Sequence, residues 1–455
     1  MTPALRALRR CFEGAVPASI ATCAPDGTPN VAKLSHVHYL DDGHVALSYQ
    51  FFNKTRENVL HNARATVEVL DPVTAAQYTL WLEYLRTETE GPLFENMKAR
   101  LAAIASHTGM SKVFRLLGSD VYRVLRVEAA EGDMCADSSP RAGLLSGLRA
   151  CLGDLAACAD LSHLLDVALE GLERHWDIRH AMLLMLEADN RRLYTVASRG
   201  YRESGVGSEV HMGEGIVGVA AGARTPIRIG YAVQEYRYSQ ATRQHFAHSD
   251  NGNVLETEIP FPGLVDAGSQ LAVPLVLGNL PGGRLLGVLY VESPLEQRFT
   301  YEDEDALVVL AGHLALSIDF LSRSTEQSAE PPTNPIATPV PKAHGAPVQI
   351  RHFPADNSVF VDNEYLIKGV AGAIIWKLLR EHAEAGRAEF TNRELRLDAS
   401  LKLPDITDNL DARLILLQRR LAERCPFLAI EKTGRGRFRL NVGRPLGLSE
   451  ATAAA

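Results

Sequence analysis

One stretch of the chain, residues 48–72, combines the residue types that a phosphate group needs. Its sequence, SYQFFNKTRENVLHNARATVEVLDP, predicts a strand, then a short helix, then a second strand. Lys54, Thr55 and Arg56 stand where that helix begins, and the outward N–H groups of a helix start favour an anion. The spacing therefore allows a phosphate site. The alternative is a solvated helix cap that carries a basic pair.

The segment before this stretch must hold it in place. β-rich runs alternate there with the turn dipeptides Asp26-Gly27 and Asp42-Gly43. A meander of this kind closes into a barrel, because closure removes the unpaired strand edges. We therefore expect a barrel whose last strand leads into the helix.

Residues 31–39 read as one of the barrel strands. Alternation places Lys33 and Ser35 on one face of that strand. His36 and His38 share the other face, which permits a metal or haem ligand. Histidines in a barrel usually have hydrogen-bond partners instead, and no metal site is predicted.

Residues 17–72 resemble the FMN-binding split barrel of the pyridoxamine 5′-phosphate oxidase family. The resemblance lies in the ATxxPDGxPxV opening, the K-x-S strand and the FxNKTRxN step. It implies an FMN cofactor whose phosphate is held by the Lys/Thr/Arg step. Relatives bind FMN, a deazaflavin, haem or no known ligand, so a deazaflavin and haem stay open as alternatives. The family's substrate-phosphate residues have no match here. By position, the cofactor-binding residues are Lys33, Ser35, His36, Ser48, Gln50, Phe51, Lys54, Thr55 and Asn58.

Residues 144–321 resemble a GAF domain. The run from 144 to 176 is apolar at helical spacing and predicts two helices with a break near 158–161. The landmarks that follow are Gly213-Glu-Gly-Ile-Val-Gly218, Ser269-Gln-Leu-Ala-Val-Pro274 and Leu286-Gly-Val-Leu-Tyr-Val-Glu292. The resemblance implies a small-molecule ligand of unknown identity, or a homodimer formed through the flanking helices. The insert at 235–262 could cover a pocket or be a polar loop.

Residues 348–447 resemble the winged-helix DNA-binding domain of OmpR-type response regulators. The pattern is a helix ended by Gly386, a capping box Thr391-x-x-Glu394, a third helix at 408–424 and the hairpin IEKTGRGRFRL. The resemblance implies double-stranded DNA as a partner. Its contact residues by position are Arg413, Gln418, Arg419 and Arg420 in the third helix and Lys432, Arg435 and Arg437 in the hairpin.

The third helix departs from that pattern. Ile415 and Leu416 occupy positions that are usually polar, and Asp405, Asp408 and Asp411 near its start would repel phosphate. A winged helix kept for protein contact or dimerisation is therefore the alternative for this segment.

Composition agrees with a multidomain, soluble chain. The 455 residues suggest about three domains of about 150 residues each. Residues 347–447 hold 17 Lys and Arg against 13 Asp and Glu, a net charge of +4, although the whole chain has −8. The six cysteines show no CxxC spacing and indicate a reducing compartment, so we expect a cytoplasmic protein. No apolar run approaches the roughly 20 residues of a membrane span.

These patterns predict a multidomain α+β protein. The expected order is a split β-barrel (1–130), a GAF α/β sandwich (144–321), a Pro-rich linker (322–347) and a winged helix-turn-helix (348–447). We find no Ser/His/Asp, Cys/His or carboxylate constellation, so no catalytic residue is predicted, and any chemistry would be the flavin's own. The expected function is a sensory transcription regulator. The alternatives are an FMN-dependent oxidoreductase with regulatory appendages and a signalling adaptor that does not bind DNA.

Overall fold

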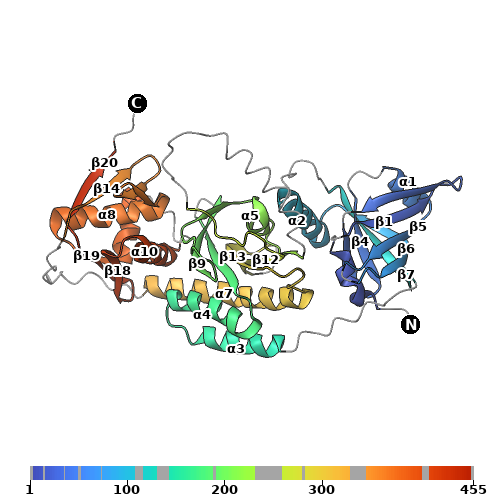
Figure 1. Cartoon of the computed structure of the whole chain (residues 1–455), viewed down its shortest axis with the longest axis horizontal. Coiled ribbons are helices and arrows are strands. Elements are labelled where there is room, and N and C mark those ends of the chain that lie inside the picture. Colours follow the sequence, from blue (N-terminus) through green and yellow to red (C-terminus); the bar gives the residue numbers. More distant parts are fainter. Residues whose placement is uncertain are drawn as a thin grey trace.

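The computed structural model describes residues 4–13, 16–34, 36–49, 53–72, 74–107, 116–130, 143–187, 191–230, 259–278, 282–327, 345–401 and 409–451. These residues form a mixed α+β protein of three units that lie in a row (Figure 1). We call them the N-terminal unit (4–130), the central unit (143–327) and the C-terminal unit (345–451). The central unit lies between the other two.

The N-terminal unit is built on a seven-stranded antiparallel sheet with the order β2-β1-β5-β6-β7-β4-β3. Gly27, at the predicted first turn, has a φ of +86°, which suits a glycine in a tight hairpin. Alternate strand residues such as Val67, Leu80 and Leu82 are almost fully buried in its core. The strands are β1 (Ala18–Cys23), β2 (Pro29–Leu34), β3 (Val37–Asp41), β4 (His44–Tyr49), β5 (Arg64–Leu70), β6 (Gln77–Glu88) and β7 (Gly118–Ala129), and the helices are the 3-10 helix η1 (Leu5–Phe12), α1 (Asn53–His61) and α2 (Pro92–His107).

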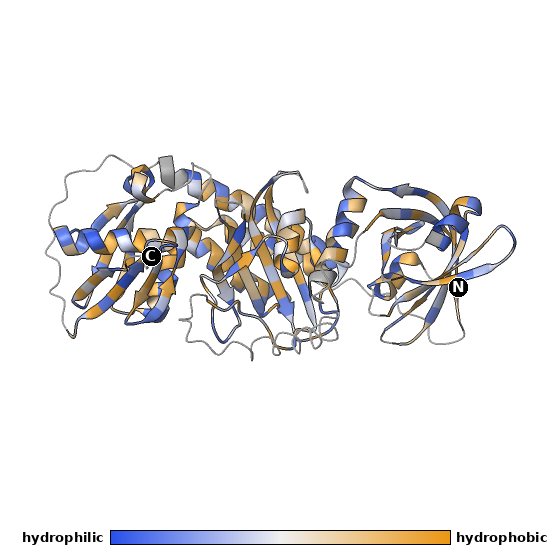
Figure 2. Ribbon diagram, turned by 90° about the horizontal axis from the view of Figure 1, so that it is seen from above, coloured by the Kyte–Doolittle hydropathy of each residue, from blue (hydrophilic) through white to orange (hydrophobic). Residues whose placement is uncertain are grey.

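The central unit has a six-stranded antiparallel sheet with the order β10-β9-β8-β13-β12-β11. Its two faces are covered by different helices, and hydrophobic residues gather along the sheet and the helices that face it (Figure 2). The strands are β8 (His180–Leu186), β9 (Arg192–Arg199), β10 (Glu209–His211), β11 (Ile227–Ile229), β12 (Ser269–Leu277) and β13 (Arg284–Ser293), and the helices are α3 (Leu144–Ala156), α4 (Leu161–Trp176), α5 (Gly215–Ala223) and α7 (Tyr301–Gln327).

Strand β12 shows how the sandwich is divided. Leu271 and Val273 face the core shared with α3, α4 and α7, whereas the intervening Ala272 faces the core shared with α5. Ala99 and Ala103 of α2 enter the second core, so the N-terminal unit packs directly on the central one. Two adjacent units therefore share apolar as well as polar contacts.

The local backbone geometry requires glycine at three positions of the first predicted GAF landmark. Gly213 and Gly215 have positive φ angles of +85° and +58° in the turn that leads into α5. At Gly218 a Cβ would lie only 2.1 Å from the carbonyl oxygen of His211, so only glycine lets α5 approach β10 this closely. The predicted break between the first two helices is confirmed, since α3 ends at Ala156 and α4 begins at Leu161.

In its described residues the C-terminal unit combines two small sheets with three α-helices and one 3-10 helix. One sheet has the order β16-β15-β14-β20 and the other β17-β19-β18. The predicted capping box is confirmed, because Thr391 accepts from the N–H of Glu394 while the Glu394 side chain accepts from the N–H of Thr391. The elements are β14 (Val348–Phe353), β15 (Ser358–Val361), β16 (Glu364–Ile367), α8 (Gly369–Ala385), β17 (Glu389–Thr391), α9 (Asn392–Leu397), η2 (Ala399–Leu401), α10 (Leu410–Arg424), β18 (Leu428–Gly434), β19 (Arg437–Val442) and β20 (Leu446–Glu450).

Two expectations about segment ends were wrong. Helix α7 runs to Gln327, past the start of the predicted linker at 322, while residues 328–344 of that linker lie outside the described residues. The winged helix was expected to end at residue 447, but strand β20 continues to Glu450 and pairs in parallel with β14. This pairing satisfies the backbone of a strand edge that would otherwise be exposed.

By length and composition, residues Tyr301–Arg323 of α7 pass the test for a membrane-spanning helix, with a mean hydropathy of 1.5. One such helix is weak support for a membrane, because a core helix passes the same test. Leu307, Leu310 and Leu314 are at most 1% exposed and pack into the sheet. We therefore describe α7 as a core helix of the central unit.

Candidate functional site

The predicted phosphate stretch forms the start of α1. Asn30 Nδ2 donates to Thr55 Oγ1 at 2.9 Å, and Asn58 Nδ2 donates to Thr22 Oγ1 at 3.0 Å. Thr55 and Asn58 are buried, so these bonds fasten α1 to strands β1 and β2. Asn58 Oδ1 is buried without a hydrogen-bond partner among the described residues.

The two cations of this stretch have different surroundings. The Lys54 side chain is 57% exposed, with its Nζ 4.0 Å from Glu57. Arg56 instead donates to Asp120 at 2.5 Å and lies over the Tyr49 ring, so its charge is already balanced. For a phosphate group, Lys54 at the start of α1 is the accessible cation, whereas Arg56 is engaged with Asp120.

The other predicted cofactor residues are placed as follows. Lys33 is exposed on β2, and its Nζ donates to Ser19 Oγ at 2.8 Å. Ser48 is buried on β4. Ser35, Gln50 and Phe51 lie outside the described residues. The structure therefore brings Thr55 and Asn58 together against β1 and β2.

The histidine pair lies at the junction of the N-terminal and central units. The rings of His36 and His38 are 6.0 Å apart between centroids. Both ring nitrogens of His36 are buried without a hydrogen-bond partner among the described residues, contrary to our expectation of a bonded barrel histidine. Burial, aided by nearby Arg100, lowers the pKa of His36 well below its usual range and that of His38 to about 3.

A buried carboxylate closes the same junction. Glu13 of the N-terminal unit accepts from Arg228 of β11 at 2.9 Å and lies 3.5 Å from Arg100. Arg228 also donates to Glu304 of α7 at 2.9 Å. Sequence reasoning missed this cluster, because its members are spread over the chain from residue 13 to residue 304 and carry no motif. Among the described residues, no group of three or more His, Cys, Asp and Glu side chains is placed to hold a metal ion.

A second buried carboxylate lies in the central unit. Glu292 of β13 accepts from the N–H of Leu264 at 2.8 Å and from the Tyr290 hydroxyl at 2.9 Å. Burial raises the pKa of Glu292, with these hydrogen bonds opposing the shift. Gln270 Oε1 is buried without a hydrogen-bond partner in the part of the chain that is described. A protonated carboxyl at this place would suit such an unsatisfied acceptor. Most of the predicted insert lies outside the described residues.

Helix α10 carries the predicted DNA-contacting residues, and the structure sets them against protein. Arg413 Nη2 donates to Glu187 of the central unit at 3.3 Å, and its guanidinium lies over the Tyr194 ring at 4.1 Å. Arg419 donates to Asp166 at 2.7 Å.

The two remaining predicted residues of α10 point into the C-terminal unit itself. Arg420 is buried and donates to the backbone oxygen of Leu366, and Gln418 donates to that of Ile430. The hairpin residues differ from these helix residues. Lys432 and Arg435 are exposed, and Arg437 is partly exposed.

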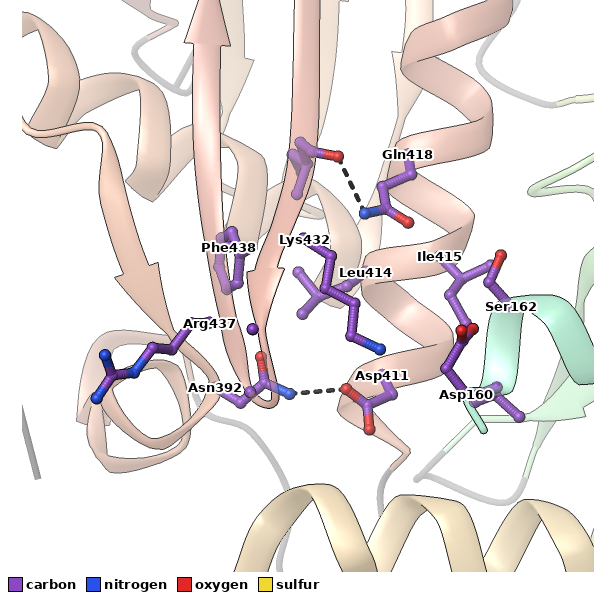
Figure 3. Close-up of a pocket in the computed structure, with 14 residues that line it drawn as sticks. Asp160, Ser162, Asn392, Asp411, Leu414, Ile415, Gln418, Lys432, Arg437 and Phe438 are labelled. Atoms are coloured by element: carbon purple, nitrogen blue, oxygen red, sulfur yellow. Dashed lines mark hydrogen bonds between the residues drawn. The ribbon is translucent and has the colours of Figure 1, made fainter. Parts of the chain in front are cut away.

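A cavity of about 180 Å³ lies where α10, the hairpin β18–β19 and the start of α4 meet (Figure 3). Asp411 accepts from Asn392 at one end of it. Asp160 and Ser162 of α4 face α10 from the other unit. The cavity is therefore bounded by both units. Its lining is Asp160, Leu161, Ser162, Asn392, Asp411, Leu414, Ile415, Gln418, Ile430, Lys432, Gly434, Gly436, Arg437 and Phe438.

Comparisons with known proteins gave the following similarities. A search of curated proteins found no match. Among solved structures, the GAF domain of an Acinetobacter phosphoenolpyruvate-protein phosphotransferase is 19% identical, covers 40% of this chain and 97% of its own, and has a TM-score of 0.31. An FMN-binding protein from Syntrophomonas wolfei subsp. wolfei is 16% identical. The match covers 29% of this chain and 90% of that protein, with a TM-score of 0.25. HupZ from Group A Streptococcus is 19% identical. The match covers 27% of this chain and 95% of that protein, with a TM-score of 0.22.

The family comparison is the most specific of these findings. Residues 158–319 match the family model of the GAF domain, which spans α4, the central sheet and most of α7. This range agrees with the landmark glycines and with the two-layered covering of the sheet. The central unit of this chain is a GAF domain.

Proposed function

We propose that this protein is a cytoplasmic sensory transcription regulator. In it, an FMN-binding split barrel and the GAF domain control a winged helix that binds double-stranded DNA. The observation that carries the proposal is the arrangement of the C-terminal unit, in which α8, α9 and α10 precede the hairpin β18–β19. Lys432 and Arg435 are exposed on that hairpin, where a wing would contact phosphate. A GAF domain joined to such a unit favours regulation over catalysis.

FMN is the cofactor that we propose for the N-terminal unit. Lys54 and the N-terminal N–H groups of α1 would hold its phosphate, and Lys33 would lie near its ring system. Bound FMN would supply redox chemistry, which here would act as a signal. The proposal rests on the FxNKTRxN step and on the exposure of Lys54. A deazaflavin or haem would be the outcome if the absorption spectrum of the purified protein lacked flavin bands.

A homodimer formed through the GAF helices is part of the proposal. Val309, Leu316 and Phe320 of α7 are 51%, 62% and 69% exposed and recur at helical spacing on one face. Such a stripe suits a second copy of the same helix. Leu316→Glu should shift the mass measured by light scattering from dimer to monomer, with Glu302→Gln, at a partly exposed position away from the stripe on the same helix, as the control.

DNA binding can be tested on the hairpin. Replacing Lys432 and Arg435 together by alanine should weaken binding of the full chain to a fluorescent duplex of mixed sequence. The slope of log affinity against log salt should become shallower by about 0.9 for each lost phosphate contact. Arg380→Ala, an exposed arginine of α8 outside the predicted DNA-contacting set, is the matched control. An unchanged affinity and slope in the double variant would remove the wing from the proposal.

One observation favours a second candidate, a signalling adaptor without DNA. The arginines of α10 contact the GAF domain, as a protein-contact helix would. The two candidates differ in whether those contacts can open.

A further inference from the structure

We infer that the GAF domain holds the C-terminal unit in a state that excludes DNA. It does so by covering the face of α10 that would enter the major groove, and opening of this contact would be the activating step. The inference rests on the proposed DNA-binding function. It goes beyond that function because it assigns the control to one interface, formed by α10 with α4 and β9.

The first part of the interface is a buried ion pair. Arg413 of α10 reaches Glu187 at 3.3 Å, and the two side chains are only 4% and 12% exposed. The guanidinium also stacks 4.1 Å from the centre of the Tyr194 ring of β9. Both partners belong to the GAF domain. An arginine bound in this way cannot at the same time present its donors to a base.

The second part lies six residues, or about 1.7 turns, further along α10. Arg419 donates to the backbone oxygen of Val196 at 3.2 Å and to Asp166 of α4 at 2.7 Å. The Asp166 side chain is 54% exposed, so this pair forms the rim of the interface. Its partial exposure makes it the place where the contact can be altered without disturbing the GAF core.

A chain of alternating charges extends the interface. Glu187 also pairs with Arg192 at 3.2 Å, and Arg192 pairs with Glu209 at 2.7 Å. Glu209 in turn lies 3.4 Å from Lys368, which precedes α8 of the C-terminal unit. Ion pairs from the C-terminal unit therefore enter the network at both ends, through Arg413 and Lys368.

The apolar side chains of α10 agree with a protein-covered helix. Ile415 and Leu416, which the DNA-binding pattern expects to be polar, are 6% and 2% exposed. They belong to one continuous hydrophobic core that includes Leu161 and Val196 of the GAF domain. Ile415 lines the cavity together with Leu161 at the start of α4, so burial between the two units explains why this position is apolar.

The covered state and the DNA-bound state exclude each other. The major groove is about 12 Å wide, and a helix with its side chains is about 10–12 Å across. The groove therefore admits α10 alone, with no room for α4 and β9 on the same helix. DNA binding through α10 requires that the GAF domain first leave it.

The interface also has a feature that favours opening. The cavity of about 180 Å³ lies between α10 and the hairpin β18–β19, and the start of α4 forms one of its sides. Interfaces with such a void have fewer van der Waals contacts than a domain core, so they separate at lower cost. Part of the contact between the two units is therefore left unfilled, which lowers the cost of separating them.

The test uses full-length variants with charges changed on the GAF side only. Asp166→Lys places a cation against Arg419 and should open the interface. Glu170→Lys makes the same charge change one turn along α4. Glu170 pairs with Arg174 and Arg199 of the GAF domain itself, so it is the matched control for added positive charge. Amide hydrogen exchange of α10 reports opening, and a fluorescent duplex of mixed sequence reports DNA binding.

The inference predicts that Asp166→Lys speeds exchange in α10 and raises DNA affinity at least tenfold over Glu170→Lys. If wild type and both variants bind DNA equally well, the inference is overturned while the proposed function stands. If α10 opens in Asp166→Lys and no variant binds DNA, the proposed DNA-binding function is wrong. The contact of α10 with the GAF domain then cannot inhibit DNA binding either.

A locked form gives an independent arm. Lys368→Cys with Glu209→Cys can be joined by a short bismaleimide, in a background where Cys23, Cys135 and Cys158 are serine. Neither position belongs to the predicted DNA-contacting set. Joining should abolish duplex binding, and the unjoined protein should retain it. Binding that persists in the joined protein would overturn the inference.

Discussion

Arg228 of the GAF domain donates a hydrogen bond of 2.9 Å to Glu13 of the N-terminal unit, although the two residues are 215 positions apart. Their side chains are only 3% and 5% exposed. The pair therefore joins two units through a contact that solvent hardly screens. The same arginine reaches Glu304 of α7, so one side chain connects three elements.

Glu13→Gln should loosen this junction by less than the roughly 3–5 kcal/mol of a fully broken buried pair, because it removes one of the two carboxylates that balance the buried Arg228 guanidinium and leaves Glu304 in place. Hydrogen exchange of η1 and β11 measures the effect locally. Glu302→Gln is the control, since Glu302 pairs with Arg9 in a more exposed setting and should cost only about 0–1 kcal/mol. Equal effects of the two substitutions would contradict the role given to Glu13.

Acid should destabilise the N-terminal unit through His36 and His38. Their pKa values are lowered in the folded state, so the folded protein binds fewer protons than the unfolded chain does. The stability that the two neutral histidines contribute is therefore complete above the ordinary histidine pKa of about 6.5 and is lost as pH falls below it, down to about 3 for His38. Each such histidine contributes about 1.4 kcal/mol per pH unit in that window.

The fluorescence of Trp81 can follow this unit alone, because Trp176 and Trp376 lie in the other two units and can be replaced by phenylalanine. His38→Gln should reduce the slope of the unfolding free energy against pH below pH 6.5. The reduction should correspond to about one bound proton fewer in the unfolded state. Groups that face the pair are Arg100, Arg228 and Glu13, and Glu13 alone opposes the shift of His38. An unchanged slope in His38→Gln would assign the acid sensitivity to other groups.

Glu292 should make the GAF domain more stable at acid pH than at neutral pH. Its pKa is raised in the folded state, so the stabilising contribution is complete below the ordinary glutamic acid pKa of about 4.3 and is lost as pH rises through the raised value. Glu292→Gln should remove that dependence. Denaturant midpoints read from Trp176 fluorescence, from acid to neutral pH, provide the comparison.

Two glycines of α5 form a matched pair for a packing test. Gly218→Ala should destabilise the GAF domain by about 1–3 kcal/mol or more, because the new Cβ would meet the backbone of His211. At Gly222 the nearest atom to a new Cβ is 3.9 Å away. Gly222→Ala should therefore raise stability by about 0.5–1 kcal/mol through helix propensity. Similar thermal shifts for both would show that close approach at Gly218 is unimportant.

Local patterns predicted the elements well wherever neighbours in sequence decide the structure. The capping box at Thr391, the end of α8 at Gly386 and the break before Leu161 are set by residues within a few positions. Strand β20 was missed because its partner, β14, is about a hundred residues away. Its sequence has no β-branched residue to indicate a strand.

The site was less predictable, because its chemistry depends on contacts between units. Position alone assigned Arg413 and Arg419 to DNA, and only the folded chain puts Glu187 and Asp166 beside them. In the sequence, the apolar residues Ile415 and Leu416 were the available indication that α10 contacts protein. Apolar side chains on a supposedly exposed helix face indicate a protein partner, although they do not say which one.

The length of helix α7 determines how far a movement at one of its ends displaces the other. Its 27 residues make a rod of about 40 Å at about 1.5 Å per residue. Its first turn meets Arg9 and Arg228 at the junction with the N-terminal unit, and its last residue, Gln327, opens the connection to the C-terminal unit. A tilt of about 5° at the first turn would displace the far end by about 3–4 Å, given that length. A small rotation of α7 at the junction with the N-terminal unit would therefore move the other end of the helix by about the length of a hydrogen bond.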